Sequence, residues 1–320
     1  QEGNAMNTKP VFHGSDIEKI CEYYHLNQED IVNFGANVNP IGISTHVKQV
    51  LASHLDLLSS YPDRDYQSLR NTVSEYCGVP ADYVLPGNGS SELISLLIET
   101  RAPKRTLLLG PTYSEYSREL SLSNSKCNEF LLKETDEFIL NVDFLCQSLL
   151  AGSYDFLIIC NPNNPTGTVV DSEELKEFIH KVPKDIIIVV DEAYIELSSN
   201  PDVKSMVSEI SDDTNVVVAR TFSKLYGLAG VRLGYAMCNK EMHAILQKCT
   251  SVFTGSRVAL AGAMAALDDE EYIKKTKAAM LEGRKYLTDE FTKMGFYVYP
   301  SETNFLYVNT GYNAAEFAEE

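Results

Sequence analysis

A lysine that follows a short apolar segment is the residue of this sequence best suited to covalent chemistry. Lys224 comes shortly after Val216–Ala219, inside the segment RTFSKLYGLAGVRLG that ends at Gly234. Ligands bind at the carboxyl ends of the strands in open α/β sheets, so a strand here would deliver Ser223, Lys224 and Arg232 to a binding site. A surface lysine in a glycine-rich loop is the alternative interpretation, because most lysines lie at the surface.

Two other apolar runs end in polar residues. Ile186–Val190 leads directly into the sequence DEAY, whose first residue is Asp191. Burial of an unpaired carboxylate costs several kcal/mol, so Asp191 needs a cation or a strong hydrogen-bond donor as its partner. A helix cap or a structural ion pair is the alternative role. The run Phe156–Cys160 is followed by NPNNPTG at 161–167, which by itself indicates only a turn.

A third segment is typical of a turn that opens a helix. It has the sequence GNGSSELI and runs from Gly87 to Ile94. The backbone N–H groups of Ser90 and Ser91 would face an anion there, and the helix dipole favours negative charge at that end. A dinucleotide-binding loop is the competing interpretation. We reject it because Glu92 occupies the place of the third glycine of GxGxxG.

The elements that must position these residues alternate along the chain. Short apolar runs followed by helical patterns predict an α/β fold with a mostly parallel sheet. The segment Asp171–His180 is typical of a helix, because Asp171 can cap its N-terminus and Glu174 follows three residues later, as in a capping box. The expected strands of the sheet are Thr106–Leu109, Phe156–Cys160, Ile186–Val190 and Val216–Ala219. The expected later elements are helices Arg257–Leu267, Glu271–Met294 and Ala314–Glu320, with strands Phe296–Tyr299 and Phe305–Val308 between them.

The motifs NPxNPTG, DEAY, SK and a following Arg occur in this order. The sequence therefore resembles the class I and II aminotransferases, and among them the branch of histidinol-phosphate aminotransferases and threonine-phosphate decarboxylases. The resemblance runs from about His13 to Phe305. It implies the fold-type I architecture of enzymes that use pyridoxal 5'-phosphate, in which a large domain with a mostly parallel sheet between helices joins a smaller α/β domain. We expect an N-terminal arm over 1–35, a large domain over 36–255 and an incomplete small domain over 256–320.

The resemblance also implies roles for single residues. Lys224 would hold the cofactor as a Schiff base, and Asp191 would keep its pyridine nitrogen protonated. The resemblance implies that Asn164 and Tyr194 donate hydrogen bonds to the phenolic oxygen, which favours its anionic form. The other implied cofactor contacts are Gly89, Ser90, Ser91, Ser223 and Arg232 around the phosphate, and Tyr113 and Ala193 on the two faces of the ring.

Three further positions match residues that face the substrate or a second subunit. Tyr61, in Tyr-Pro-Asp, matches a tyrosine that reaches the partner's cofactor phosphate, which implies a homodimer with shared sites. A simple turn is the alternative at this position. His13 and Asn37 match the substrate side of the N-terminal arm. A structural role is the alternative for His13, since Ser15 departs from the His-Gly-Gly opening of the decarboxylase branch.

The sequence departs from the family pattern near its end. Phe253–Arg257 replaces the usual Asn-Ser/Ala-Leu pattern, and either a compensating role for Arg257 or a solvent-facing one fits. We expect the arginine that grips the substrate carboxylate to lie beyond Glu320.

The implied reaction is transfer of an amino group from a small phosphorylated amino acid or amine, similar to histidinol phosphate, to a 2-oxo acid. Decarboxylation of threonine phosphate is the second hypothesis, because Lys224 and Asp191 serve both reactions. A non-catalytic or regulatory domain that binds pyridoxal phosphate within a longer chain is the third. The intact set of Lys224, Asp191, Asn164, Tyr194 and Arg232 argues against this third hypothesis.

Composition excludes several other classes of protein. The 320 residues include 45 acidic and 27 basic side chains, for a net charge of −18, and a field of that sign repels nucleic acid and anionic membranes. No apolar run reaches the roughly 18 residues of a membrane span, and Gln1–Pro10 lacks the apolar segment of a signal peptide. We expect small-molecule substrates, and neither nucleic acid nor a membrane as a partner.

Cysteine and histidine usage favours a cytoplasmic protein without a metal. The seven cysteines include no CxxC pair, which is typical of free thiols in a reducing cytoplasm. The six histidines form neither HExxH nor HxH, so we expect no metal site.

Overall fold

The computed structural model describes residue 12 and residues 14–318, and it divides the chain into two compact units, 1–38 and 39–320. The first unit contains α1 (Ile17–Tyr24) and the short helix η1 (Gln28–Asp30). The ring of Phe12 packs against Tyr23 and Tyr24, with centroids 5.4 and 6.2 Å away. His13 lies outside the described residues. The predicted boundary between residues 255 and 256 stays a prediction.

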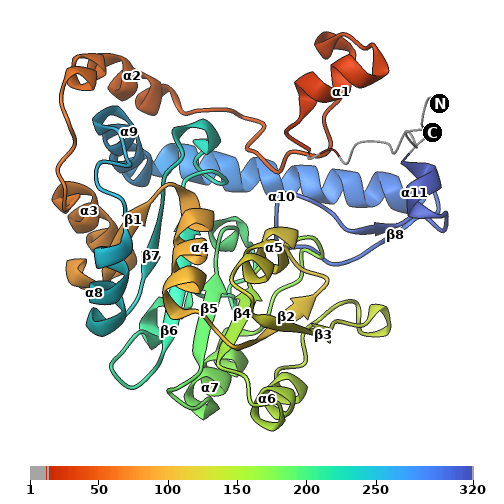
Figure 1. Cartoon of the computed structure of the whole chain (residues 1–320). Coiled ribbons are helices and arrows are strands. Elements are labelled where there is room, and N and C mark those ends of the chain that lie inside the picture. Colours follow the sequence, from red (N-terminus) through yellow and green to blue (C-terminus); the bar gives the residue numbers. More distant parts are fainter. Residues whose placement is uncertain (1–11, 13, 319–320) are drawn as a thin grey trace, which may run out of the picture. The chain divides into compact units, whose positions relative to one another are not determined.

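A seven-stranded sheet forms the centre of the second unit (Figure 1). Its strand order is β1-β7-β6-β5-β4-β2-β3, and within this sheet the described strand β7 runs opposite to the other six. This arrangement confirms the predicted α/β fold with a mostly parallel sheet. The strands are β1 (Val84–Gly87), β2 (Arg105–Gly110), β3 (Lys126–Leu131), β4 (Phe156–Cys160), β5 (Ile187–Asp191), β6 (Val216–Thr221) and β7 (Gly234–Met237).

The central strands are apolar because alternate side chains enter two separate cores. In β4, Phe156, Ile158 and Cys160 belong to a core that includes residues of α4, α5 and α8. Leu157 and Ile159 belong to the other core, which includes residues of α3, α6, α7 and α9. The helices of this unit are α2 (Thr45–Ser53), α3 (Gln67–Cys77), α4 (Gly89–Arg101), α5 (Ser114–Leu122), α6 (Val142–Ala151), α7 (Ser172–Lys181), α8 (Lys240–Cys249), α9 (Arg257–Asp268), α10 (Glu270–Lys293) and α11 (Ala314–Phe317).

The four strands predicted for the sheet correspond to β2, β4, β5 and β6 and are confirmed within two residues at each end. The predicted cap is also confirmed, because Asp171 Oδ1 accepts hydrogen bonds from the N–H groups of Glu173 and Glu174 at 2.9 and 3.1 Å. Three strands of the sheet were not predicted because their own residues are atypical of buried strands. β1 contains Pro86, β7 begins with Gly234, and β3 is a largely exposed edge strand with polar residues.

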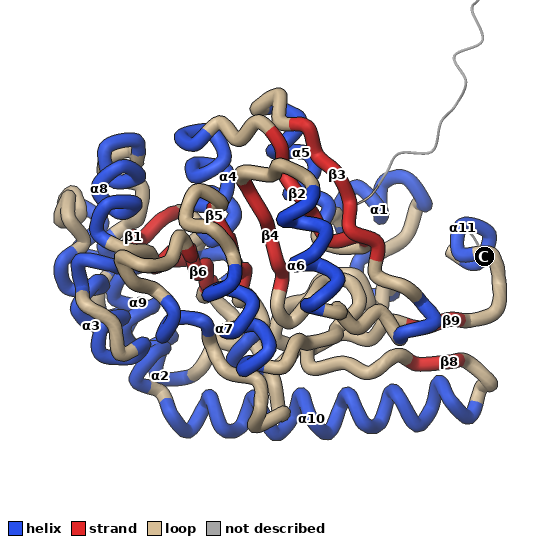
Figure 2. Tube along the Cα trace, turned by 90° about the horizontal axis from the view of Figure 1, so that it is seen from below, coloured by secondary structure: helices blue, strands red, loops and turns tan. Residues whose placement is uncertain are grey.

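The chain after β7 and α8 forms a helix pair followed by a small hairpin-like sheet. The long helix α10 runs beside β8 (Tyr297–Val298), which pairs antiparallel with β9 (Val308–Asn309), as Figure 2 shows. Both strands are shorter than the predicted ones because the segment between them turns back toward the main sheet, where Glu302 N–H donates to Gly167 O. Within the described part of the chain, no helix has the length and apolarity that crossing a membrane requires.

Candidate active site

The candidate residues follow strands that end at the same edge of the sheet. Asp191 is the last residue of β5, and Lys224 follows β6 by three residues. The register pairs Cys160 with Asp191 and Asp191 with Ala219, so the ends of β4, β5 and β6 lie side by side. The carboxyl ends of parallel strands are the usual position of a ligand site in an open α/β sheet.

Asp191 is buried but hydrogen-bonded. Asp191 is 5% exposed, and its Oδ2 atom accepts a hydrogen bond from the Tyr116 hydroxyl at 2.6 Å. Oδ1 accepts another from the Ala193 N–H at 3.0 Å. Burial raises the pKa of the Asp191 carboxyl above its ordinary value, although these two bonds and the charge of Lys224 oppose the shift. The carboxylate is thus held in place for a cationic partner.

Tyr116 is a site residue that sequence reasoning missed. It lies on α5, three residues after Tyr113, so the two rings share one side of the helix and pack edge to face at 5.4 Å. Its spacing of three residues from Tyr113 is visible in the sequence, but the sequence does not indicate that Asp191 is its partner. Tyr113 itself is half-buried at the start of α5, where burial raises the pKa of its hydroxyl and an interaction with the Ser91 side chain opposes the shift.

Lys224 lies close to Asp191 and Tyr194. Burial lowers the pKa of the Lys224 amine below its ordinary value, the charge of Asp191 opposes this, and the charge of Arg232 adds to it. The Nζ atom lies 5.2 Å from the centroid of the Tyr194 ring. A lysine with a lowered pKa is more often neutral, and the neutral amine is the form that attacks a carbonyl carbon.

Several residues predicted to bind the phosphate lie around the first turn of α4. Gly89 adopts a φ of +83°, and a Cβ added there would lie 2.7 Å from Arg232 Nη2. A Cβ added to Gly234 would lie 2.6 Å from the Ser90 nitrogen, so β7 packs directly under this turn. A side chain at position 234 would clash with backbone atoms, and the positive φ at position 89 favours glycine.

Ser223 joins this cup from the end of β6. Thr221 pairs with Gly234 in the sheet, and its hydroxyl donates to Ser223 Oγ at 3.0 Å. The guanidinium of Arg232 and the N–H groups in the first turn of α4 give this region positive charge and hydrogen-bond donors. The structure thus brings Gly89, Ser90 and Arg232 together, with Ser223 hydrogen-bonded to the residue that pairs with Gly234 and Ser91 beside Tyr113.

The turn that carries Asn164 is tied to the loop after β2. Asn163 Nδ2 donates to Pro111 O at 3.0 Å and to Thr166 Oγ1 at 2.8 Å. Its Oδ1 accepts a hydrogen bond from Thr112 Oγ1 at 2.8 Å. Asn163 is therefore a structural residue that sequence reasoning did not single out, and it positions its neighbour Asn164.

Two buried contacts support the segment around Lys224. Asn39 Nδ2 donates to Leu225 O at 2.8 Å, directly after the lysine. Arg220 Nε lies 3.0 Å from Glu192 Oε2, and these side chains are 9% and 1% exposed. This ion pair joins the ends of β5 and β6, next to Asp191. Loss of either partner would leave the other charge buried and unpaired, which is strongly destabilising.

Some predicted residues are not brought into this cluster. Tyr61 is 80% exposed, and its ring packs on Phe253 with centroids 4.9 Å apart. Arg257 donates to Ser60 Oγ at 2.6 Å, on the same part of the surface. Asn37 belongs to the first unit and His13 is not described, so their substrate roles stay predictions.

The residues present fit pyridoxal phosphate. A buried carboxylate suits a pyridinium nitrogen, a neutral-tending lysine suits an aldehyde, and Arg232 at a helix N-terminus suits a phosphate. The fit rests on the close approach of Gly89 to Arg232 and on the burial of Asp191. Among the described residues, no group of three or more potential metal ligands lies together.

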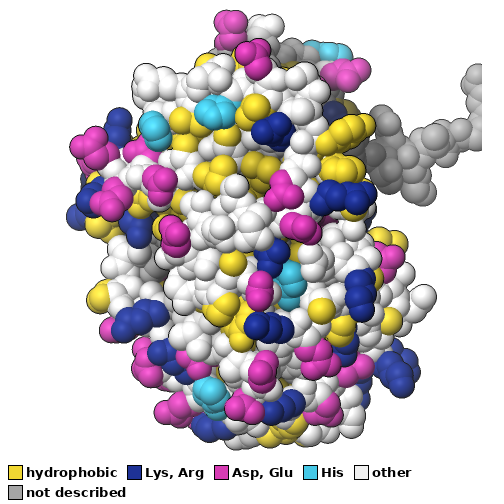
Figure 3. Space-filling view, turned by 90° about the vertical axis from the view of Figure 1, so that its left-hand side faces the viewer, with side chains coloured by type: hydrophobic (Ala, Val, Ile, Leu, Met, Phe, Trp, Pro, Cys, Tyr) yellow, Lys and Arg dark blue, Asp and Glu magenta, His cyan; other side chains and the backbone are white. Residues whose placement is uncertain are grey.

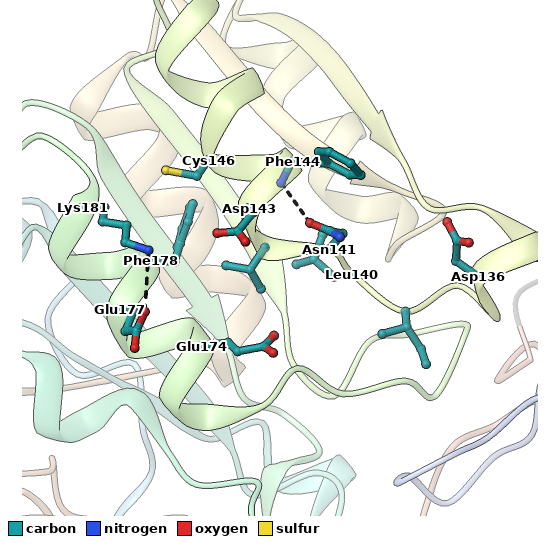
Figure 4. A pocket seen from close by; sticks show the side chains of 12 residues that line it. Asp136, Leu140, Asn141, Asp143, Phe144, Cys146, Glu174, Glu177, Phe178 and Lys181 are labelled. Carbon is teal, nitrogen blue, oxygen red and sulfur yellow. Dashed lines mark hydrogen bonds and ion pairs between the residues drawn. The ribbon is translucent and has the colours of Figure 1, made fainter.

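A cavity of about 580 Å³ lies elsewhere, between α6 and α7 (Figure 4). Four carboxylates, Asp136, Asp143, Glu174 and Glu177, contribute to its lining, and Lys181 pairs with Glu177 at 3.6 Å. So many negative charges repel a phosphate. This cavity is therefore unsuited to the cofactor, in contrast to the region around Arg232.

Comparisons with known proteins agree with this geometry. The sequence profile of the family described as aminotransferase class I and II matches residues 29–320. Histidinol-phosphate aminotransferase of Bacillus pumilus is 31% identical, over 96% of this chain and 84% of that protein.

Two solved structures share the fold. Histidinol-phosphate aminotransferase of Sinorhizobium meliloti, in complex with pyridoxal-5'-phosphate, is 23% identical with a TM-score of 0.86, over 96% of this chain and 82% of that one. L-threonine-O-3-phosphate decarboxylase of Porphyromonas gingivalis is 21% identical with a TM-score of 0.77, over 89% of this chain and 84% of that one. Enzymes of both reaction types therefore adopt this fold, and the predicted fold-type I architecture is confirmed.

Substitution of Gly234 tests the phosphate cup. We expect Gly234→Ala to weaken binding of pyridoxal phosphate by roughly 10-fold, the scale of one lost charge-assisted hydrogen bond, because its Cβ would displace the Ser90 nitrogen. Fluorescence titration of the apo-protein measures this affinity. Gly230→Ala is the matched control, since a Cβ there meets no atom within 4 Å. Equal affinities for the two variants would contradict the assignment of the cup.

Proposed function

We propose that this chain, which belongs to the aminotransferase class I and II family, transfers the amino group of histidinol phosphate, or of a closely similar phosphorylated amine, to a 2-oxo acid. Membership of the family makes the chain a pyridoxal-phosphate-dependent aminotransferase with an amino donor and a 2-oxo acid as substrates. The clustering of Lys224, Asp191 and the Arg232 cup is the observation that carries the proposal. The named donor is supported by the identity with histidinol-phosphate aminotransferase over nearly the whole chain.

The proposed roles follow from the chemistry of each side chain. Bound pyridoxal phosphate would supply an aldehyde for amines and a ring that accepts electrons from a cleaved Cα bond. Lys224 would hold the cofactor and then move the proton at the substrate's Cα, for which its lowered pKa suits it. Asp191 would keep a proton on the ring nitrogen. Burial makes the charge of Asp191 more effective than it would be in water.

The remaining residues would bind and orient. Asn164 and Tyr194 would donate hydrogen bonds to the phenolic oxygen, and Tyr113 and Ala193 would cover the two faces of the ring. The phosphate would be bound by Gly89, Ser90, Ser91, Ser223 and Arg232. His13 and Asn37 would contact the substrate from the N-terminal arm.

We further propose a homodimer in which Tyr61 contacts the cofactor phosphate of the partner subunit. Figure 3 shows hydrophobic side chains between mixed charges on the side of the molecule that carries α2 and α3. Large apolar side chains are exposed on and beside η2 (Leu55–Ser59), namely Leu55, Leu58, Tyr61 and Val252. A second copy of the chain would cover such a surface, and a symmetric pair lets each Tyr61 reach the other site.

The proposed location is the cytoplasm. All seven cysteines are free thiols, including the exposed Cys127 and Cys249. Free exposed thiols persist in a reducing compartment, whereas an oxidising one promotes disulfides.

The reaction type is tested with the two candidate donors. We expect the protein with bound cofactor to form glutamate from histidinol phosphate and 2-oxoglutarate, because the proposed arrangement cleaves the Cα–H bond. Lys224→Ala is the control and should form none. Carbon dioxide release from threonine phosphate without an oxo acid would overturn the proposal in favour of decarboxylation. Binding of pyridoxal phosphate with neither activity would instead favour a non-catalytic role.

The shared site is tested by mixing variants. Tyr61→Phe has an intact lysine, and Lys224→Ala has an intact tyrosine, so a heterodimer of the two would contain one complete site. We expect activity above the sum of the separate variants after unfolding and refolding the mixture. In the control, Tyr286→Phe takes the place of Tyr61→Phe, because Tyr286 is an exposed tyrosine on α10. A mixture of Tyr286→Phe with Lys224→Ala should show no activity above the sum of the two separate variants. Sedimentation of the wild-type protein as a monomer would refute the dimer.

A further inference from the structure

Glu302 lies between β8 and β9, and one oxygen of its carboxylate accepts four hydrogen bonds. Its Oε2 accepts from the Ser198 and Ser199 hydroxyls, each at 3.0 Å. The same atom accepts from the Ser199 N–H at 2.7 Å and the Asn200 N–H at 3.2 Å. All four donors belong to the loop that follows Tyr194 and η5 (Ile195–Leu197), so one carboxylate fixes the path of this loop.

The backbone of the same residue holds a second loop. Glu302 N–H donates to Gly167 O at 2.8 Å. Gly167 has a φ of +75°, and a Cβ added to it would lie 2.5 Å from Ser301 Oγ, so the two segments are in close contact. Gly167 ends the turn that carries Asn164. Glu302 therefore contacts the loops of both residues proposed to bind the phenolic oxygen of the cofactor.

Arg284 on α10 reinforces these contacts. Its Nη2 lies 3.6 Å from Glu302 Oε2 and donates to Ser199 Oγ at 2.7 Å. Its Nη1 donates to Thr303 O at 3.0 Å. The side chains of Arg284 and Glu302 are 10% and 22% exposed, so water screens their interaction only in part. Hydrogen bonds to charged groups in such surroundings are about twice as strong as neutral ones.

A third contact links the same segment to Tyr194. The ring of Phe305 packs edge to face on the Tyr194 ring, with centroids 5.1 Å apart. The segment from Ser301 to Phe305 thus touches Tyr194 directly, the loop after it, and the turn of Asn164. These contacts are far apart in sequence, with Glu302 and Ser199 separated by 103 positions.

We propose that Glu302 is a positioning residue that, through the turn of Asn164 and the loop after Tyr194, sets the hydrogen bonds these two residues make to the cofactor. The inference rests on the proposed roles of Asn164 and Tyr194. Glu302 acts through other residues and touches neither cofactor nor substrate. Removal of its charge leaves the four donors of the loop after Tyr194 with a weaker acceptor, so that loop gains freedom. Weaker donation to the phenolic oxygen favours its protonated form.

Two measurements on Glu302→Gln test this role. In the apo-protein, hydrogen exchange of segment 198–200 should be roughly 10-fold faster, the scale expected for losing a charged hydrogen-bond acceptor. In the cofactor-bound protein, the pH midpoint of the visible absorbance should move upward and kcat should fall by about 10-fold, with KM for the amino donor nearly unchanged. Glu282→Gln is the matched control, because it removes the same charge from an exposed position two residues from Arg284.

Ser199→Ala is a milder second variant, since it removes only the hydroxyl that bridges Glu302 and Arg284. It should speed hydrogen exchange and move the pH midpoint of the absorbance upward, as expected for Glu302→Gln. If Glu302→Gln does not fold, this variant tests the positioning role in its place. Faster exchange with an unchanged absorbance midpoint and kcat would overturn the positioning role while leaving the proposed aminotransferase function intact. A wild-type protein that binds no pyridoxal phosphate would refute both, and the exchange data would still report the contacts of Glu302.

Discussion

A carboxylate at the end of a hydrophobic strand loses its hydration, and the rest of the site depends on how that loss is compensated. Asp191 accepts hydrogen bonds from the Tyr116 hydroxyl and the Ala193 N–H, and the charged form of Lys224 lies near it. These partners come from α5, from the residues after β5 and from the loop after β6. Because the buried carboxylate needs these partners, three segments lie together at the same edge of the sheet. The Arg220–Glu192 ion pair keeps β5 and β6 together just behind this point.

Charge is distributed so that an anion is attracted to one place on an acidic protein. The chain carries a net charge of −18, and the cavity between α6 and α7 is lined by four carboxylates. Arg232, against the first turn of α4, provides a local positive region in spite of this total. Local donors at short distance outweigh a distant field, because exposed charges beyond a Debye length of about 8–10 Å are largely screened. An acidic enzyme can thus bind a phosphorylated cofactor, and the acidic surface discourages other polyanions.

The sequence was informative for strands that are buried on both faces and for the residues that directly follow them. Strands buried on both faces read as apolar runs, so β4 was predicted with its observed bounds and β5 within one residue. Lys224 and Asp191 were identifiable because each follows such a run. Tyr116 and Asn39 were not, since their partners lie 75 and 186 positions away and only the folded chain brings them together. Glu302 was missed for the same reason. The edge strand β3 was missed because its exposed polar residues lack an apolar pattern.

The most direct test of the account is to identify the residue that binds the cofactor covalently. The purified protein is loaded with pyridoxal phosphate, reduced with borohydride, digested, and its peptides are analysed by mass spectrometry. The account predicts loss of the visible absorbance band on reduction and a pyridoxyl group on Lys224, in the peptide that follows β6. A reduced cofactor on any other lysine would contradict it, because the amine beside Asp191 would then have no role in holding pyridoxal phosphate.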